Sequence, residues 1–250
     1  DRSRNPTGGN EEGYGIRMIN FFTFDGQSSA DFGVYISGGG TYNAPERDVT
    51  TYSVPGRNGD LIVDNGRFSN ITVSYEAFIV RDFSKNAERL RLWLKSKHGY
   101  KRLEDSYHTD FFRMAYLSST LDFSTGFLNW NASFTVNFVC QPQRWLKSGE
   151  FPMTLSNTGA QLFNAYMPSL PLIKVYGNGA GTLVVNQTTV TVKSINGYLM
   201  LDSETQNAYK GTENQNMNIQ AAEFPVLQNG SNIIGWSGGI TKIEITPRWW

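Results

Sequence analysis

Residues 71–79 read ITVSYEAFI, and every second side chain from Ile71 to Ile79 is apolar. Successive side chains of a β-strand point to opposite faces, so this alternation predicts a strand with one face in a core and the other in solvent. The same period of two returns at residues 132–140, 189–195 and 241–246. The sequence therefore predicts a mainly β protein.

One stretch follows a helical period instead. After Ser84, apolar side chains recur at the spacing of a single helix face, and Gly99 follows the last turn. Ser84 can cap such a helix through its hydroxyl, and the single stripe is typical of a helix that covers a sheet. The stripe consists of Ala87, Leu90, Trp93 and Leu94.

Directly before the first strand, residues 54–70 read VPGRNGDLIVDNGRFSN. The GXXG pattern at residues 56–59 matches the loop of a KH domain, but that loop joins two helices, and no Gly-Lys-Ser/Thr follows for a phosphate-binding loop. We expect turns, a short strand and a tight turn at residues 64–66, which together make a β-hairpin arm that pairs with a neighbouring subunit. The arm residues expected at this interface are Pro55, Gly56, Arg57, Asn58, Gly59, Asp64, Asn65 and Gly66.

Charge and cysteine content exclude several classes of protein. Lys plus Arg and Asp plus Glu both number 22, which gives no basic surface for direct nucleic-acid binding, and no apolar run is long enough to insert in a membrane. Cys140 is the only cysteine, so neither an internal disulfide nor a thiolate-rich metal site can form. Because Cys140 continues an alternating strand, we expect a buried structural thiol.

No motif indicates catalysis, a metal or a cofactor. His98 and His108 lie ten residues apart, without the spacing of zinc ligands, and a Gly-x-Ser-x-Gly nucleophile elbow is absent. Two acidic residues brought together by folding could still form a hydrolase site. Exposed tryptophans could stack on a sugar or contact a partner, although tryptophans after a final strand more often cover a core edge. The candidates for such contacts are Trp236, Trp249 and Trp250.

We divide the chain into a leader at residues 1–17, an N-terminal domain at 18–145 and a C-terminal domain at 146–250. The second domain carries frequent turn signals, such as YGNGAGT at residues 176–182. Asn196-Gly197 suits a type I′ turn, which predicts a hairpin between the strands on either side of it. We expect this domain to be a β-sandwich.

Two groups of motifs together resemble one family. The first is the arm sequence followed by an alternating strand and a helix that ends in LRLWLKSKHGYKRLED at residues 90–105. The second is NGYLMLDSETQNAY at 196–209, FPVLQNGSN at 224–232 and ITKIEITPRWW at 240–250. In this order they resemble the siphovirus distal tail proteins, or Dit proteins, which are baseplate hubs of phage tails.

The resemblance implies a structural virion protein at the distal end of the tail, without enzymatic activity or cofactor. It implies an N-terminal β-sandwich with one helix and the hairpin arm, and a C-terminal galectin-like β-sandwich. A homo-hexameric ring would join the tail tube protein to the tail-associated lysin or fibre protein and to a receptor-binding protein. The alternative is a carbohydrate-binding module that adheres to cell-wall saccharide.

Overall fold

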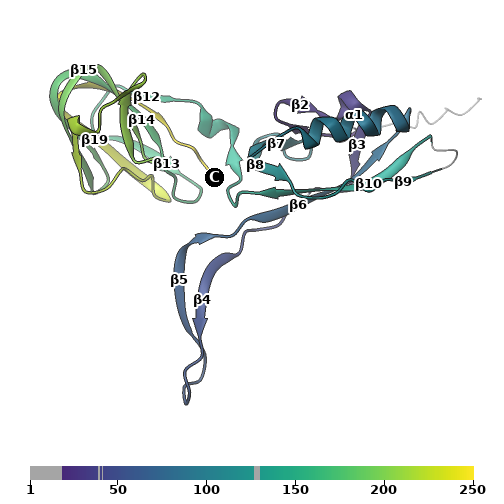
Figure 1. Ribbon diagram of the computed structural model, residues 1–250. Coiled ribbons are helices and arrows are strands. Elements are labelled where there is room, and N and C mark those ends of the chain that lie inside the picture. Colours follow the sequence, from purple (N-terminus) through teal and green to yellow (C-terminus); the bar gives the residue numbers. More distant parts are fainter. Residues whose placement is uncertain (1–18, 39, 41, 127–129) are drawn as a thin grey trace, which may run out of the picture.

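The chain forms two β-sheets that lie side by side, and a long hairpin projects from the first of them (Figure 1). This computed structural model describes residues 19–38, 40, 42–126 and 130–250, and the expected leader at 1–17 lies outside them. Each sheet packs around its own cluster of buried hydrophobic side chains, one running from Phe22 to Cys140 and the other from Leu146 to Trp249. The predicted mainly β class is confirmed.

The first sheet is built around β6 (Ile71–Ile79), the strand that opened the sequence argument. It pairs along its whole length with the antiparallel strand β10 (Ala132–Cys140). Among the described residues the strand order is β2-β1-β7-β8-β10-β6-β3, with β9 on β10 and β11 on β8. The other strands of this sheet are β1 (Phe22–Phe24), β2 (Gln27–Ser28), β3 (Val34–Ser37), β7 (Lys101–Asp105), β8 (Phe111–Leu117), β9 (Ser124–Thr125) and β11 (Trp145–Leu146).

The alternation in sequence becomes alternation in burial. Ile71, Val73, Tyr75, Ala77 and Ile79 are all buried, while the residues between them face outward. Cys140 is fully buried at the end of β10, and burial raises the pKa of its thiol to about 12. The prediction of a structural thiol is confirmed, because a thiol with this pKa carries almost no thiolate at neutral pH.

Helix α1 (Phe83–Lys95) covers the buried face of the first sheet (Figure 1). Its predicted stripe is buried, and the ring of Trp93 stacks on Phe32 at 4.5 Å and on Phe22 at 6.0 Å between centroids. These aromatic contacts join the helix to β1 and to the 3₁₀ turn η1 (Ser29–Phe32). The helix therefore completes the core, as the sequence predicts.

The predicted cap at Ser84 is wrong. The helix begins at Phe83, and the residue before it, Asp82, has a left-handed φ of 48° and no side-chain cap hydrogen bond. The N–H of Asn86 donates to the carbonyl oxygen of Asp82 at 3.0 Å. Phe83 lies in the first turn because its ring packs against Phe123 at 5.6 Å, so tertiary packing fixes the start of the helix.

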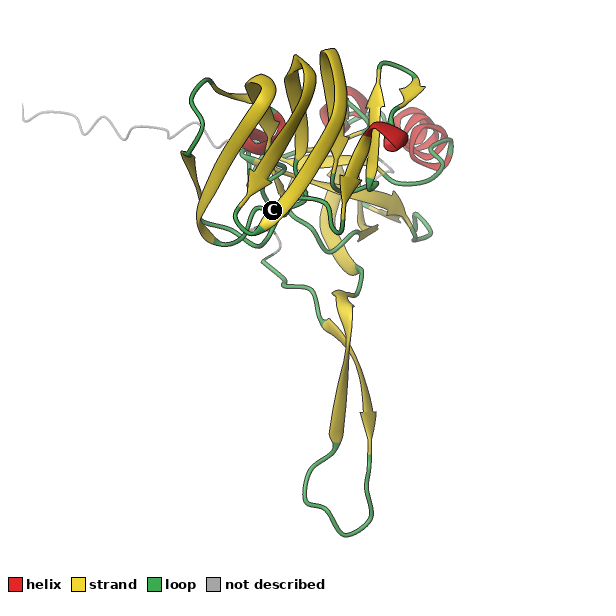
Figure 2. Cartoon of the chain, turned by 90° about the vertical axis from the view of Figure 1, so that its left-hand side faces the viewer, coloured by secondary structure: helices red, strands yellow, loops and turns green. Residues whose placement is uncertain are grey.

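The second sheet contains three long strands, β14 (Leu172–Val185), β15 (Thr188–Asp202) and β19 (Gly230–Thr246), which curve together (Figure 2). Among the described residues its order is β12-β19-β14-β15-β16-β17, with β13 on β19 and β18 on β15. The short strands are β12 (Met153–Leu155), β13 (Ala160–Asn164), β16 (Asn207–Lys210), β17 (Glu213–Asn214) and β18 (Ile219–Ala221). Short 3₁₀ turns are η3 (Lys147–Glu150) and η4 (Asn216–Asn218).

Glycines let the long strands bend, so that one curled sheet encloses a core. The register between β14 and β19 shifts around Gly177 and Gly181. A Cβ on Gly177 would lie 2.0 Å from the carbonyl oxygen of Gly239, a distance that no side chain allows. The glycine-rich runs therefore mark bulges inside strands, where the sequence analysis expected turns.

The hairpin predicted at Asn196-Gly197 is wrong. Both residues lie inside β15, opposite Asn178 and Gly177 of β14, and Gly197 takes a φ of 83°. The connecting turn lies at residues 186–187, where Asn186 has a φ of 55°. The strands flanking Asn196-Gly197 pair with β14 on both sides, which forms a longer hydrogen-bond ladder than a local hairpin would.

Candidate functional site

The feature that the rest of the fold does not explain is the arm, strands β4 (Arg47–Tyr52) and β5 (Leu61–Phe68) with the loop at 53–60. It projects away from both sheets (Figures 1 and 2). Within the described residues β4 and β5 pair only with each other, so both outer edges present unpaired backbone groups. No residue from 47 to 68 is buried. An isolated two-stranded hairpin is marginally stable in water, so the arm lacks the packing that stabilises an ordinary sheet.

A bulge shapes the base of the arm. Arg47 lies opposite Phe68 and Val49 opposite Asp64, so β5 advances four residues while β4 advances two. Gly66 has a φ of +72°, and its N–H donates to the Asp64 carboxylate at 2.8 Å. The tight turn predicted at residues 64–66 is wrong, because the chain continues along β4 through this bulge.

Charged and amide side chains tie the two strands together at the bulge. Arg47 Nη1 lies 2.9 Å from Asp64 Oδ2, and Asn65 Nδ2 donates to Asp48 Oδ1 at 2.9 Å. The hydrogen bond from Asn65, followed by that from Arg67, holds the pKa of Asp48 below its usual range. Asp48 and Arg67 were not among the predicted site residues, since β4 itself was not predicted.

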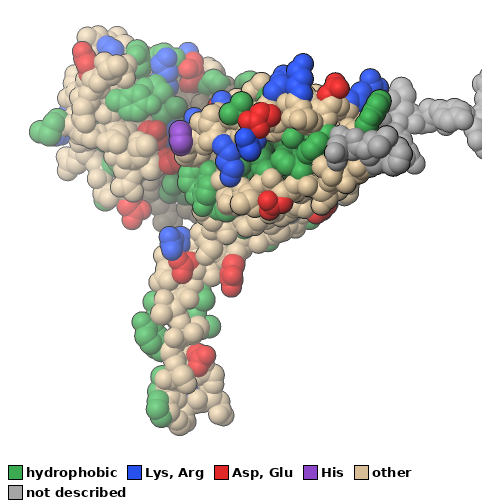
Figure 3. Space-filling model, turned by 45° about the vertical axis from the view of Figure 1, so that its right-hand side comes forward, with side chains coloured by type: hydrophobic (Ala, Val, Ile, Leu, Met, Phe, Trp, Pro, Cys, Tyr) green, Lys and Arg blue, Asp and Glu red, His purple; other side chains and the backbone are tan. Residues whose placement is uncertain are grey.

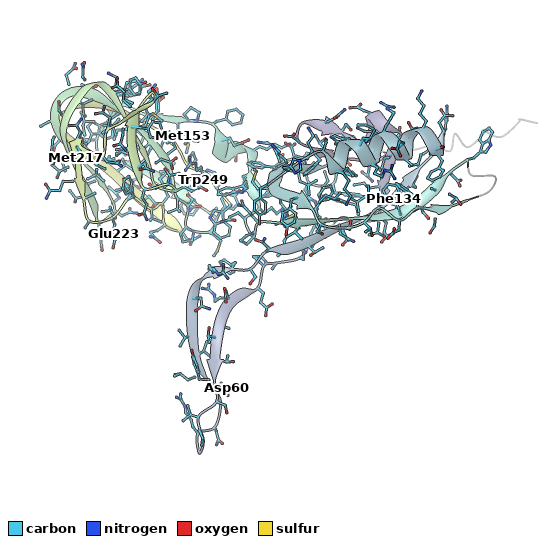
Figure 4. All side chains as sticks on the ribbon, viewed as in Figure 1. Asp60, Phe134, Met153, Met217, Glu223 and Trp249 are labelled. Atoms are coloured by element: carbon cyan, nitrogen blue, oxygen red, sulfur yellow. The ribbon has the colours of Figure 1, made fainter. Side chains whose placement is uncertain are left out.

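The far end of the arm is a glycine-dependent loop. The N–H of Arg57 donates to the carbonyl oxygen of Val54 at 3.1 Å, and Gly56 has a φ of +80°, so Pro55-Gly56 forms a type II turn. Gly59 also has a φ of +80°. Asp60 marks this end in Figure 4, far from Phe134 in the first sheet and Trp249 in the second. The predicted arm residues thus form two groups, 55–59 at the tip and 64–66 at the bulge.

Between these two groups the arm is apolar and exposed (Figure 3). Val49 is 41% exposed, Tyr52 55%, Leu61 44%, Ile62 65% and Val63 46%. Contiguous exposed apolar surface of this kind marks an interaction site. The run Leu61-Ile62-Val63 was the sequence signal for it, although the sequence analysis assigned the interface to the turn residues instead.

The three candidate tryptophans lie apart in function. Trp249 is buried in the second core and closes its edge, so it offers no ring to a sugar. Trp236 packs partly against the same core. Trp250 donates through Nε1 to the carbonyl oxygen of Pro168 at 3.0 Å, and its ring lies 6.1 Å from that of Phe68 at the base of the arm. Trp250 therefore links the C-terminal sheet to the arm.

Backbone pairing joins the two sheets. Strand β11 (Trp145–Leu146) pairs with β8, and the N–H of Leu146 donates to the carbonyl oxygen of Trp249 at 2.9 Å. Gly149 lies against the same segment, where a Cβ would meet the Trp249 nitrogen at 2.4 Å. A groove of about 480 Å³ remains at this junction, lined by Phe112, Met114, Gln141, Trp145, Leu146, Glu150, Glu204, Thr246 and Arg248.

The buried titratable groups of the first sheet serve structure. Tyr75 donates its hydroxyl to Asp105 at 2.8 Å, and His108 Nδ1 lies 3.1 Å from the other oxygen of that carboxylate. Desolvation, followed by the charge of Asp105, raises the pKa of Tyr75 well above its ordinary value. Over the described ranges, no three His, Cys, Asp or Glu side chains come close enough to hold a metal ion. None of the helices described here is long and apolar enough to cross a membrane.

No protein-family model and no curated protein sequence matches the chain. Among solved structures, the chain superposes on the SPP1 Dit protein with a TM-score of 0.74, covering 91% of this chain and 98% of that one at 12% identity. The chain shares the fold of a Dit protein. The phage p2 baseplate in its activated conformation, with Ca or with Sr, gives TM-scores of 0.47 and 0.48 at 9% and 10% identity, over 91% of this chain and 98% and 97% of the other.

The structure also gives a physical reason for the C-terminal motifs. Asp202, which ends β15, accepts two hydrogen bonds from Arg248, Nη1 to Oδ1 at 2.7 Å and Nη2 to Oδ2 at 3.2 Å. Asn232 is fully buried, and its amide donates to three carbonyl oxygens, those of Leu162, Gln228 and Gly230. These residues hold the sheet closed, so the motifs encode the fold of the Dit type.

Proposed function

We propose that the chain is a structural, non-enzymatic subunit of a phage tail tip, a baseplate hub of the Dit type. The observation that carries the proposal is the match to the SPP1 Dit protein, which extends over 91% of the chain and is described there as a hub adsorption apparatus of phages that infect Gram-positive bacteria. Residues 18–145 would form a homo-hexameric ring, with residues 146–250 projecting from it. The tail tube protein, a tail-associated lysin or fibre protein and a receptor-binding protein would be its partners in the virion.

The arm supports this assembly. Its exposed apolar side chains and unpaired edges suit a contact with the adjacent protomer. A heterologous contact of this kind, repeated with a closing rotation, makes a ring.

Solution mass tests the ring directly. Six copies of the 28.0 kDa chain should appear at about 168 kDa in size exclusion with light scattering. Deletion of residues 57–66 should return the protein to a smaller species, and Ile62→Asp should do the same. The matched control is Asn58→Asp, which adds the same charge at the tip. A ring that survives the deletion would refute the arm as the seam.

The saccharide alternative has less support, because Trp249 lies in the core. A glycan array probed with the full chain tests it, and specific binding that Trp236→Ala abolishes would favour it.

A further inference from the structure

The register of the arm divides its side chains between two faces. Directly opposed residues of an antiparallel pair share a face. Tyr52 lies opposite Leu61, and Val63 lies two residues further along on the same face. Ile62 points to the other face, which it shares with Val49. The exposed apolar side chains are therefore split, three on one face and two on the other.

Neither face is covered by the chain itself. In β6 the apolar positions are buried and the positions between them are exposed, which is how a strand with one solvent face looks. In β5 the consecutive residues Leu61, Ile62 and Val63 are apolar, and all three are exposed. A continuous apolar run in a strand is typical of burial on both faces. The sequence of the arm thus fits a two-sided environment that one chain does not provide.

Charge points to copies of the same chain as the covering surfaces. The charged residues of the arm are three arginines and three aspartates, and they lie at its base or tip: Arg47, Asp48, Arg57, Asp60, Asp64 and Arg67. They sum to zero, as do the 22 basic and 22 acidic residues of the chain. A neutral arm on a neutral chain meets no electrostatic barrier to self-association and has no attraction to a strongly charged partner.

We infer that the arm is inserted between two surfaces contributed by neighbouring copies of this chain, so that both of its faces are buried in the assembly. This inference rests on the proposed ring and adds a geometry to it. An arm laid on one neighbour would cover only one face. An inserted arm ties three copies together, its own and the two that enclose it.

Thiol labelling distinguishes these geometries, because Cys140 is buried and leaves the native chain without a reactive thiol. Single cysteines are placed on the two faces as Ile62→Cys and Val63→Cys, with Ser156→Cys on an exposed loop as the control. Each full-length variant is first sized by light scattering. Its labelling rate with a maleimide is then compared between the assembled and the dilute monomeric fractions.

Insertion predicts that assembly slows labelling about tenfold or more at both position 62 and position 63, and leaves position 156 unchanged. Protection at only one of the two positions, with the ring intact, overturns the insertion and leaves the proposed ring standing. Labelling of both at the monomer rate within an intact ring also overturns it. A chain that stays monomeric at every concentration overturns the ring and the insertion together.

Discussion

The ion pair between Arg248 and Asp202 offers the sharpest test of how the second sheet is held closed. The two side chains join the last residues of the chain to the end of β15, 46 positions apart. Arg248 also lies 3.1 Å from Glu204 and donates to the carbonyl oxygen of Leu170 at 3.3 Å. The perturbation is Arg248→Ala, which removes all of these contacts and leaves the Asp202 carboxylate without its cation.

The burial of the pair sets the size of the effect. The Arg248 side chain is 22% exposed and that of Asp202 10%. A charged hydrogen bond contributes about 1.5–3 kcal/mol, and an unpaired buried charge costs more, up to about 5 kcal/mol when fully desolvated. For this partly exposed pair we expect Arg248→Ala to lower the free energy of unfolding by about 2–3 kcal/mol. That corresponds to a fall of about 4–12 °C in the melting temperature of the second sheet.

Thermal unfolding followed by tryptophan fluorescence measures this fall, since Trp249 lies beside the pair and is buried. The matched control is Arg91→Ala on α1, whose partner Glu88 lies 2.8 Å away with both side chains more than half exposed. An exposed pair contributes about 0–1 kcal/mol, so the control should melt near the wild-type temperature. Equal effects of the two substitutions would refute the reasoning from burial.

The same pair predicts a pH dependence. Burial alone would raise the pKa of Asp202, but the hydrogen bonds and charge of Arg248 outweigh it and lower that pKa. A carboxyl whose pKa is lower in the folded state stabilises the protein above its unfolded pKa of about 3.9 and loses this contribution as the pH falls through the folded value. Asp202→Asn should therefore destabilise the protein at pH 7 and flatten its acid-induced loss of stability. An unchanged acid limb would count against the pair as its source.

Three further substitutions test the packing. Gly239→Ala places a Cβ 1.9 Å from the Asn178 carbonyl oxygen and should prevent the second sheet from closing, while Gly197→Ala meets no atom within 4 Å and should cost only about 1–2 kcal/mol for its positive φ; similar circular dichroism melts for both would contradict this. Trp93→Ala should cost about 3–5 kcal/mol in urea unfolding, and a loss below 1 kcal/mol would show that α1 is not part of the core. Cys140 should react with a disulfide reagent only after unfolding, and rapid reaction of the native protein at pH 8 would disprove its burial.

The local patterns that sequence reasoning reads well are the ones that burial repeats. Alternation in residues 71–79 predicted β6, and the 3.6-residue stripe predicted α1, because a side chain's direction follows directly from its place in a strand or helix. Neither pattern identifies a partner strand. Asn196-Gly197 has the residues of a hairpin turn, yet β14 supplies partners on both sides of it, and that competition is visible only in three dimensions.

The candidate site divides in the same way. The sequence by itself determined that an arm exists and that a strand-like apolar run lies within it. Only the tertiary structure decided that this run stays exposed on both faces, because exposure depends on what else the chain brings near, and here it brings nothing. Likewise the sequence placed Asp202 and Arg248 on separate strands, and only the closure of the curled sheet brought the carboxylate within 2.7 Å of the guanidinium.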